Sequence, residues 1–174
     1  MKKFELTTDR IEENGTALYR IKALIDFGDV KAGDLGGYVE KEENLSQSGN
    51  AWVYDNALVY GDALVYGNAR VYGNAQVYDD AQVYGNALVR GNARVRGNAR
   101  VSGNADYICL EGFGSHNRST TMFRTKGGNI CVSCGCFSGT LEEFESKVKE
   151  THGNNKFARE YLTLVEAAKI HFEV

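Results

Sequence analysis

The stretch from Gly112 to Thr121 brings together residue types that hold anionic ligands. It contains flexible glycines, four hydroxyl side chains and the guanidinium of Arg118. Glycine amides, hydroxyls and guanidinium groups all donate hydrogen bonds to phosphates and carboxylates. The sequence therefore predicts a binding site for a small anionic ligand, such as a nucleotide derivative, at Ser115, Arg118, Thr120, Thr121 and Arg124, with His152 and Lys156 as lesser candidates. A polar hairpin loop without a ligand is the alternative.

Three cysteines, Cys131, Cys134 and Cys136, are close enough in sequence to suggest metal binding. A structural zinc ion needs four converging ligands. Side chains alternate between the two faces of a strand, so Cys134 and Cys136 are expected on one face and Cys131 on the other. We therefore predict core thiols, with a zinc site or a reactive nucleophile as alternatives, and we expect no cofactor.

A six-residue unit, Val-Tyr-Gly-Asn-Ala-x, repeats in register from Ala51 to Ala105 and must position these groups. This period fits neither a helix face nor an alternating strand, but it fits one side of a coil in a parallel β-helix. Val and Ala are expected to point inward. Gly and Asn suit the corners because they tolerate a positive φ, and Asp replaces Gly at 55 and 79. We place Val39 and Leu45 at the small-residue position and start the coils near Leu35, which predicts about four coils.

The chain divides into three segments on this basis. Residues 1–34 are predicted to form an N-terminal β cap, residues 35–106 the β-helix, and residues 107–174 a small α+β recognition module. The overall fold class is therefore mainly β. In the module, we predict strands at 106–124 and 130–137.

Two helices are predicted to close the module. The first opens at Thr140, where Glu143 completes a capping box, and it ends at Gly153. The second runs from about Asn155 to Ile170.

The repeat resembles the left-handed hexapeptide-repeat β-helix family. In that family three units make a coil of about 18 residues, so residues 18 apart lie above one another. Packing of neighbouring solenoids in the family implies a homo-oligomer, with a trimer expected. Exposed tyrosine ladders are typical of interfaces. The predicted interface residues are Tyr54, Tyr60, Tyr66, Tyr72, Tyr78 and Tyr84.

Two further stretches resemble sequences common in phages and prophages. Asp29–Val39 and Asn44–Val53 are similar to the opening of a phage solenoid family, and Cys134–Phe144 with Thr151–Lys156 is similar to a module found on phage proteins. The resemblance implies a role in host manipulation, for example counter-defence. The start of the chain, Met1-Lys2-Lys3-Phe4, has no signal-peptide pattern, so the default expectation is a cytoplasmic location, in the host bacterium.

Composition excludes several classes of partner. The chain has 174 residues with 20 basic and 23 acidic side chains, a net charge of −3, so nucleic acid is an unlikely partner. No segment is apolar enough to suggest a membrane span. Four arginines nevertheless gather in the last coil and could bind phosphate or an acidic partner: Arg90, Arg94, Arg96 and Arg100. A solvated end face, or contact with the C-terminal segment, is the alternative.

Acyltransferases of the resembling family typically use a histidine in a groove between solenoids. Here all three histidines, His116, His152 and His171, lie outside the repeat. We therefore predict a non-enzymatic protein that sequesters a small anionic ligand through the C-terminal module. One alternative is a protein-interaction inhibitor that blocks a host protein with the solenoid surface. Another is a hexapeptide-family acyltransferase, which the missing solenoid histidine disfavours.

Overall fold

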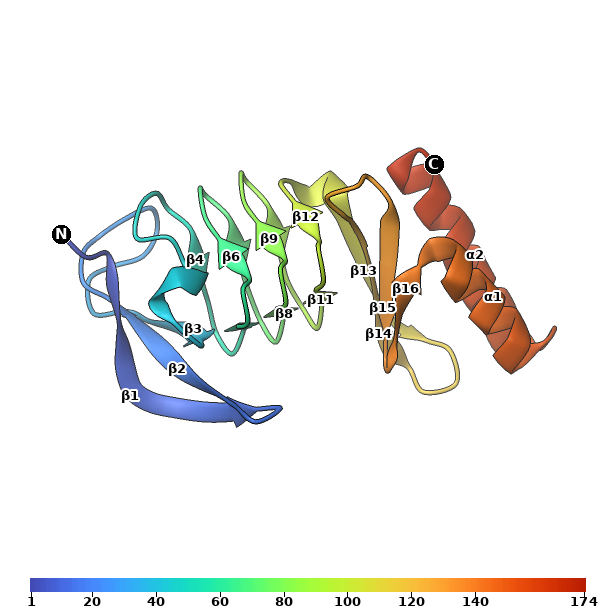
Figure 1. The fold of residues 1–174 in the computed structure, drawn as a ribbon, viewed down its shortest axis with the longest axis horizontal. Coiled ribbons are helices and arrows are strands. Elements are labelled where there is room, and N and C mark those ends of the chain that lie inside the picture. Colours follow the sequence, from blue (N-terminus) through green and yellow to red (C-terminus); the bar gives the residue numbers. More distant parts are fainter.

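A computed structural model describes residues 1–174. The N-terminal strands, a stack of β-helix coils and a C-terminal α+β module follow one another along the long axis of the molecule (Figure 1). The mainly β fold class is thereby confirmed. No helix is long and apolar enough to cross a membrane.

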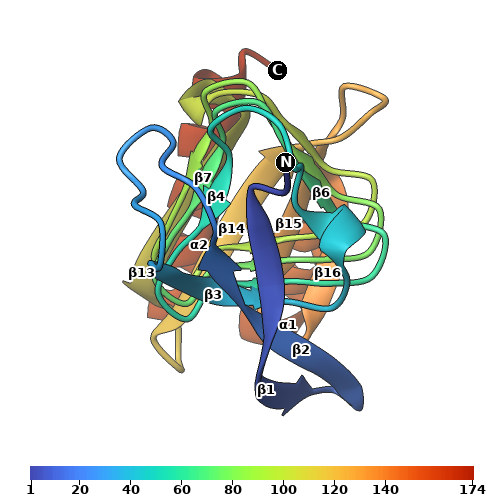
Figure 2. The ribbon, with the colours of Figure 1, turned by 90° about the vertical axis from the view of Figure 1, so that its left-hand side faces the viewer.

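The N-terminal segment is an antiparallel hairpin that leads into the first coil. Strands β1 (Phe4–Glu13) and β2 (Thr16–Ala23) meet at a tight turn, where Asn14 and Gly15 both have positive φ, as type I′ hairpins require. β2 pairs with β3 (Leu35–Val39), which joins the first wall of the solenoid. The hairpin projects beyond the outline of the coils in Figure 2, but Glu13 beside its turn accepts a hydrogen bond from the side chain of Gln76 in the repeat at 3.4 Å.

The solenoid consists of two-residue strands in three parallel walls. Their bounds are β4 (Trp52–Val53), β5 (Leu58–Val59), β6 (Leu64–Val65), β7 (Arg70–Val71), β8 (Gln76–Val77), β9 (Gln82–Val83), β10 (Leu88–Val89), β11 (Arg94–Val95) and β12 (Arg100–Val101). The walls are β3-β5-β8-β11, β4-β7-β10 and β6-β9-β12. Val53 pairs with Val71, and Val71 with Val89, so successive coils are in register.

The inward and corner positions are as the repeat predicts. Every Val of the repeat and every Ala from Ala51 to Ala99 is buried, because the β-branched side chains fill the walls and the small ones fit beside the corners. Ala105, which follows the last wall strand, is exposed. At the corner position, which is glycine in most units (for example Gly67), Asp55 and Asp79 also adopt a positive φ, of 53° and 57°. Their carboxylates offset this strain by accepting hydrogen bonds from backbone amides of the next coil, at Gly73 and Gly97.

The first coil differs from the prediction. Val39 pairs with Val59, and Leu45 bridges to Val65, so both occupy the Val position and not the small-residue position. Leu45 and Val53 are eight residues apart and not six, so this coil is two residues longer than the 18 that separate Val59 from Val77. Backward extrapolation of the period therefore placed these side chains at the wrong position.

The tyrosines form three stacked columns. Tyr54 and Tyr72 stack with ring centroids 4.2 Å apart, Tyr60 and Tyr78 at 5.0 Å, and Tyr66 and Tyr84 at 5.1 Å. The first two columns have contacts with the N-terminal segment: the Tyr54 hydroxyl donates to Asp29, and Tyr60 packs beside Ile11. In the third column, the Tyr66 hydroxyl donates a hydrogen bond to the side chain of Gln82 in the next coil.

The C-terminal module is a four-stranded antiparallel sheet with two helices. Its elements are β13 (Tyr107–Phe113), β14 (Arg118–Arg124), β15 (Ile130–Cys134), β16 (Phe137–Thr140), α1 (Leu141–His152) and α2 (Lys156–Phe172), preceded by a 3₁₀ turn at Asn104–Asp106. One face of the sheet closes the end of the solenoid, since Tyr107 and Phe123 join the core of Val and Ala rows. The other face packs on the helices through Met122 and Val132.

The helix ends agree with their predicted caps. The Thr140 hydroxyl accepts a hydrogen bond from the Glu143 amide, and the Glu143 carboxylate accepts one from the Thr140 amide. Asn155 caps α2 by accepting from the Ala158 amide. These caps fix where both helices start.

Candidate functional site

Three hollows of about 390 to 510 Å³ border the sheet of the C-terminal module. The seam hollow lies between β13 and the last coil, the polar hollow lies between β14 and the wall formed by β8 and β11, and the thiol hollow lies between the sheet and the two helices. Arg118, the first residue of β14, lines both the polar and the thiol hollow. The last two hollows therefore meet at one side chain.

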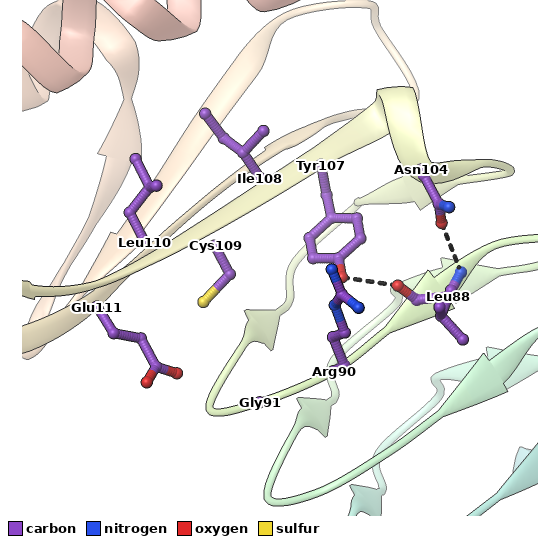
Figure 3. Close-up of a pocket in the computed structure, with 9 residues that line it drawn as sticks. All are labelled: Leu88, Arg90, Gly91, Asn104, Tyr107, Ile108, Cys109, Leu110 and Glu111. Atoms are coloured by element: carbon purple, nitrogen blue, oxygen red, sulfur yellow. Dashed lines mark hydrogen bonds between the residues drawn. The ribbon is translucent and has the colours of Figure 1, made fainter.

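The seam hollow has a volume of about 510 Å³, but its polar groups hold the module to the solenoid (Figure 3). The Tyr107 hydroxyl donates to the Leu88 carbonyl at 2.6 Å, and the Leu88 amide donates to Asn104 at 3.0 Å. The Glu111 carboxylate accepts from the amide and side chain of Asn92. Burial raises the pKa of the Cys109 thiol, which keeps that thiol protonated. We interpret this hollow as a structural seam.

The polar hollow has a volume of about 490 Å³ and is lined by no apolar side chain. Its lining comes from segments far apart in sequence: Asn74, Gln76, Asn92, Arg94, Arg118, Ser119 and Gly135. The Arg94 amide donates to the Thr121 hydroxyl at 3.0 Å, which ties the last coil to β14. Its guanidinium Nη1 reaches the Gly135 carbonyl at 3.4 Å.

The thiol hollow has a volume of about 390 Å³ and combines an apolar floor with polar groups. Phe137, Phe144 and Val148 form the floor. The groups that could do chemistry lie around it: Arg118, Cys134, Cys136, Lys147, Thr151, His152 and Tyr161. Of these, the imidazole is the type of side chain that accepts and releases protons near neutral pH.

His152 is held by aromatic contacts at the end of α1. Its ring lies 5.8 Å from that of Tyr161 and 6.0 Å from that of Phe157. Burial raises the pKa of Tyr161 to about 12, so its hydroxyl stays a neutral donor at physiological pH. That hydroxyl lies 3.9 Å from the Cys134 sulfur. The arrangement offers a proton acceptor, a neutral hydroxyl and two thiols around one apolar floor.

The predicted ligand-binding residues do not all meet in one place. Arg118 and His152 both line the thiol hollow, whereas Ser115 lies exposed in the β13–β14 turn. Thr120 and Thr121 point to opposite faces of β14, with hydrogen bonds to Cys134 and Cys109 respectively.

The remaining two candidates have partners of their own. Arg124 donates to the Phe172 carbonyl at 2.6 Å and lies 3.7 Å from Asp106. Lys156 is exposed and pairs with Glu160 at 3.4 Å. Both side chains therefore contact residues of α2.

Cys131 and Cys134 lie on opposite faces of β15, as strand alternation predicts, but the prediction of a core thiol is wrong for Cys136. Cys131 faces the solenoid core, where burial raises the pKa of its thiol, and Cys134 is buried on the helix side. Cys136 is exposed in the turn between β15 and β16. No three side chains of His, Cys, Asp or Glu converge in a way that could hold a metal ion.

Sequence reasoning missed several residues of these hollows. Lys147 and Tyr161 were not singled out, although Phe144, Lys147, Val148 and Thr151 share one face of α1 by their spacing of three and four. Arg94 was considered only as part of the arginine cluster of the last coil. Its position opposite Arg118 depends on how the sheet docks on the solenoid, which no local pattern encodes.

Comparison with known proteins gives similarity in the solenoid. A family model described as the YdcK β-solenoid repeat matches residues 51–67, 63–79 and 81–97. The coils resemble YdcK repeats. A protein named "Uncharacterized acetyltransferase YdcK", from Escherichia coli K12, is 40% identical over 63 residues. The match covers 32% of this chain and 19% of that relative, so the chain spans about a fifth of the relative's length.

This similarity corrects the functional prediction. A hexapeptide-repeat β-helix is supported, but the interpretation as a non-enzymatic binding protein that sequesters a ligand is wrong, since the similar protein is named as an acetyltransferase. The prediction depended on the lack of a histidine in the coils. The structure provides an imidazole from α1, in a hollow that shares Arg118 with the polar hollow beside the solenoid.

Proposed function

We propose that the protein is an acyltransferase whose reaction takes place in the thiol hollow, with His152 as the general base. The observation that carries this proposal is the position of the His152 imidazole beside an apolar floor, with Arg118 and Lys147 at the same hollow. The similarity of the coils to an acetyltransferase is independent support.

The hollow fits both parts of an acyl thioester. Phe137, Phe144 and Val148 offer apolar surface to the acyl chain and exclude water from the thioester. The guanidinium of Arg118 and the ammonium of Lys147 suit the anionic groups that thioester carriers bear. An imidazole in such a place contributes about 10²–10⁴-fold to a proton-transfer step.

The chemistry balances with one proton carried by His152. The oxygen or nitrogen of an acceptor attacks the thioester carbonyl carbon, and the imidazole takes the proton from the attacking atom. The new bond from carbon to oxygen or nitrogen forms as the carbon–sulfur bond breaks. The imidazolium then returns the proton to the departing thiolate.

Three earlier predictions remain proposals beside this function. The protein assembles as a trimer through tyrosine columns, it works in the bacterial cytoplasm, and it belongs to a phage or prophage type. The protein named as an acetyltransferase is similar over 63 residues, 32% of this chain, so these features, like the acceptor and the donor, belong to the proposal.

Alkylation of Cys136 tests whether a donor occupies the hollow. Cys136 is the exposed thiol of the chain and lines the thiol hollow, whereas Cys134 is buried. Acetyl-CoA at saturating concentration is expected to slow its reaction with iodoacetamide at least severalfold, and Lys147→Gln is expected to weaken that protection. Lys2→Gln, in the N-terminal segment, serves as the charge-matched control. An unchanged alkylation rate at every donor concentration would rule out this site.

A further inference from the structure

Two guanidinium groups meet at the polar hollow without a carboxylate partner. The arginines that form ion pairs in this chain are Arg20, Arg70, Arg96 and Arg124. Arg94 and Arg118 are not among them, although both line the hollow. An arginine pair left free at a concave polar surface is suited to bind an anion, because each guanidinium presents a planar set of donors.

Both arginines are positioned by the protein backbone. Arg94 is held by its own amide, bonded to Thr121, and by its guanidinium, which reaches the Gly135 carbonyl. Arg118 lies against Gly135, where φ is +60° and a Cβ would overlap the guanidinium Nη1. The same glycine therefore orients one arginine through its carbonyl and makes room for the other.

The rest of the lining suits a ligand with hydroxyl groups. Asn74, Gln76, Asn92 and Ser119 surround the arginine pair, and no apolar side chain is present. The Asn74 amide already donates to Asn92 at 3.3 Å, and Asn92 is held by Glu111, so the amides of this wall are fixed in place. The volume of about 490 Å³ lies within the range of about 300–1,000 Å³ for small-molecule sites.

We propose that the polar hollow binds the phosphate of a small, hydroxyl-rich organic phosphate between Arg94 and Arg118. Phosphate binding itself stands on the geometry above, whereas the role of that phosphate as part of a substrate rests on the proposed acyl transfer. Arg118 also lines the thiol hollow, so a molecule held by its phosphate at the arginine pair reaches toward His152.

Two sources of such a phosphate are distinguishable. If it belongs to the acceptor, a sugar monophosphate binds more tightly than a nucleotide. If it belongs to the carrier of the acyl group, adenosine 3′,5′-bisphosphate binds more tightly. In either case inorganic phosphate competes, since the arginine pair recognises the shared group.

Binding is measured by calorimetry and by ¹H–¹⁵N NMR with three probes: inorganic phosphate, glucose 6-phosphate and adenosine 3′,5′-bisphosphate. We expect saturable binding that shifts the side-chain resonances of Asn74 and Asn92 and weakens as salt is added. Arg94→Gln and Arg118→Gln are each expected to weaken it about tenfold or more, as loss of a charged hydrogen-bond partner does. Arg10→Gln removes the same charge from the exposed face of the hairpin and is expected to change nothing.

Equal binding by the wild type and both arginine variants would overturn the proposal, as would no saturable binding of any probe. The NMR spectra also report whether each variant keeps the native fold. Phosphate binding that persists in a protein without transfer activity would leave this site intact and reject the proposed acyl transfer. Transfer activity that survives both substitutions would support the proposed acyl transfer and reject the role of this phosphate as part of its substrate.

Discussion

Arg118 lies across Gly135, at a place where any side chain on that glycine would overlap its guanidinium. The contact joins the start of β14 to the turn between β15 and β16. It also places Arg118 where the polar and thiol hollows meet. The absence of a side chain at one position thus determines where a charged group lies in the proposed site.

Gly135→Ala is expected to displace Arg118 and to weaken phosphate binding about as much as Arg118→Gln does. The variant also places a Cβ at a φ of +60°, which costs roughly 1 kcal/mol of folding free energy. Gly127→Ala is the control, since nothing lies within 4 Å of its added Cβ. Calorimetric titration and urea unfolding check both effects. Phosphate binding as tight as that of the wild type would show that Arg118 does not depend on Gly135.

The buried ammonium of Lys3 is expected to make the folding stability of the protein depend on pH. Its side chain is 2% exposed, donates to the Ala51 carbonyl and lies over the Phe27 ring, and burial lowers its pKa from 10.5 to about 8. The unfolded chain therefore binds more protons than the folded chain between about pH 8 and 10.5, so this residue adds stability as pH rises through that window.

Lys3→Met isolates that contribution. The free energy of unfolding of the wild type minus that of the variant is expected to rise by roughly 1–3 kcal/mol between pH 7 and 10. Urea denaturation at several pH values measures it. Lys2→Met, at the exposed neighbouring position, is the control and is expected to give a flat difference. A flat difference for Lys3→Met as well would mean that its ammonium is not penalised by burial.

A substitution in the third tyrosine column, Tyr66 and Tyr84, tests the predicted trimer. Tyr66 and Tyr84 stack within the coils, and the Tyr66 hydroxyl donates a hydrogen bond to the side chain of Gln82. If this column forms the subunit contact, Tyr66→Arg introduces a buried charge there and converts the trimer to monomers. Tyr66→Phe, which keeps the ring, is expected to stay trimeric. Light scattering measures the mass, and a monomeric wild type would contradict the predicted assembly.

Thr140→Ala tests whether the capping box stabilises α1. The Thr140 hydroxyl accepts from the Glu143 amide at 3.2 Å, and its loss is expected to cost about 1 kcal/mol. The exposed hydroxyl of Thr163 donates to a carbonyl inside α2, so Thr163→Ala is expected to stay within about 0.5 kcal/mol of the wild type. Equal stability of the two variants in thermal unfolding would contradict the role of the cap.

The solenoid could be predicted because each position of the repeat has one structural role. Val and Ala fill the inside and Gly or Asp turns the corner, so the period alone determines the walls. The prediction fails where the period stops. Val39 and Leu45 shift because the step from Leu45 to Val53 is two residues longer than the repeat.

The candidate site was only partly predictable. Arg118 and His152 were found by their chemistry, but the grouping of Thr120 and Thr121 with them ignored strand alternation, which turns these two hydroxyls to opposite faces. Arg94 and Gly135 come together with Arg118 only because the sheet docks on the last coil. Such long-range contacts depend on tertiary packing and leave no local sequence signal.

The transfer of a labelled acetyl group tests the central claim most directly. Acetyl-CoA labelled in the acetyl group is mixed with glucose 6-phosphate or small amines, and label in the acceptor is counted for the wild type, His152→Ala and His171→Ala. His171 lies exposed on α2 and is the matched control. The account predicts transfer by the wild type and by His171→Ala, with kcat about 10²–10⁴-fold lower for His152→Ala. Equal rates for His152→Ala and the wild type, or no label in any acceptor, would contradict it.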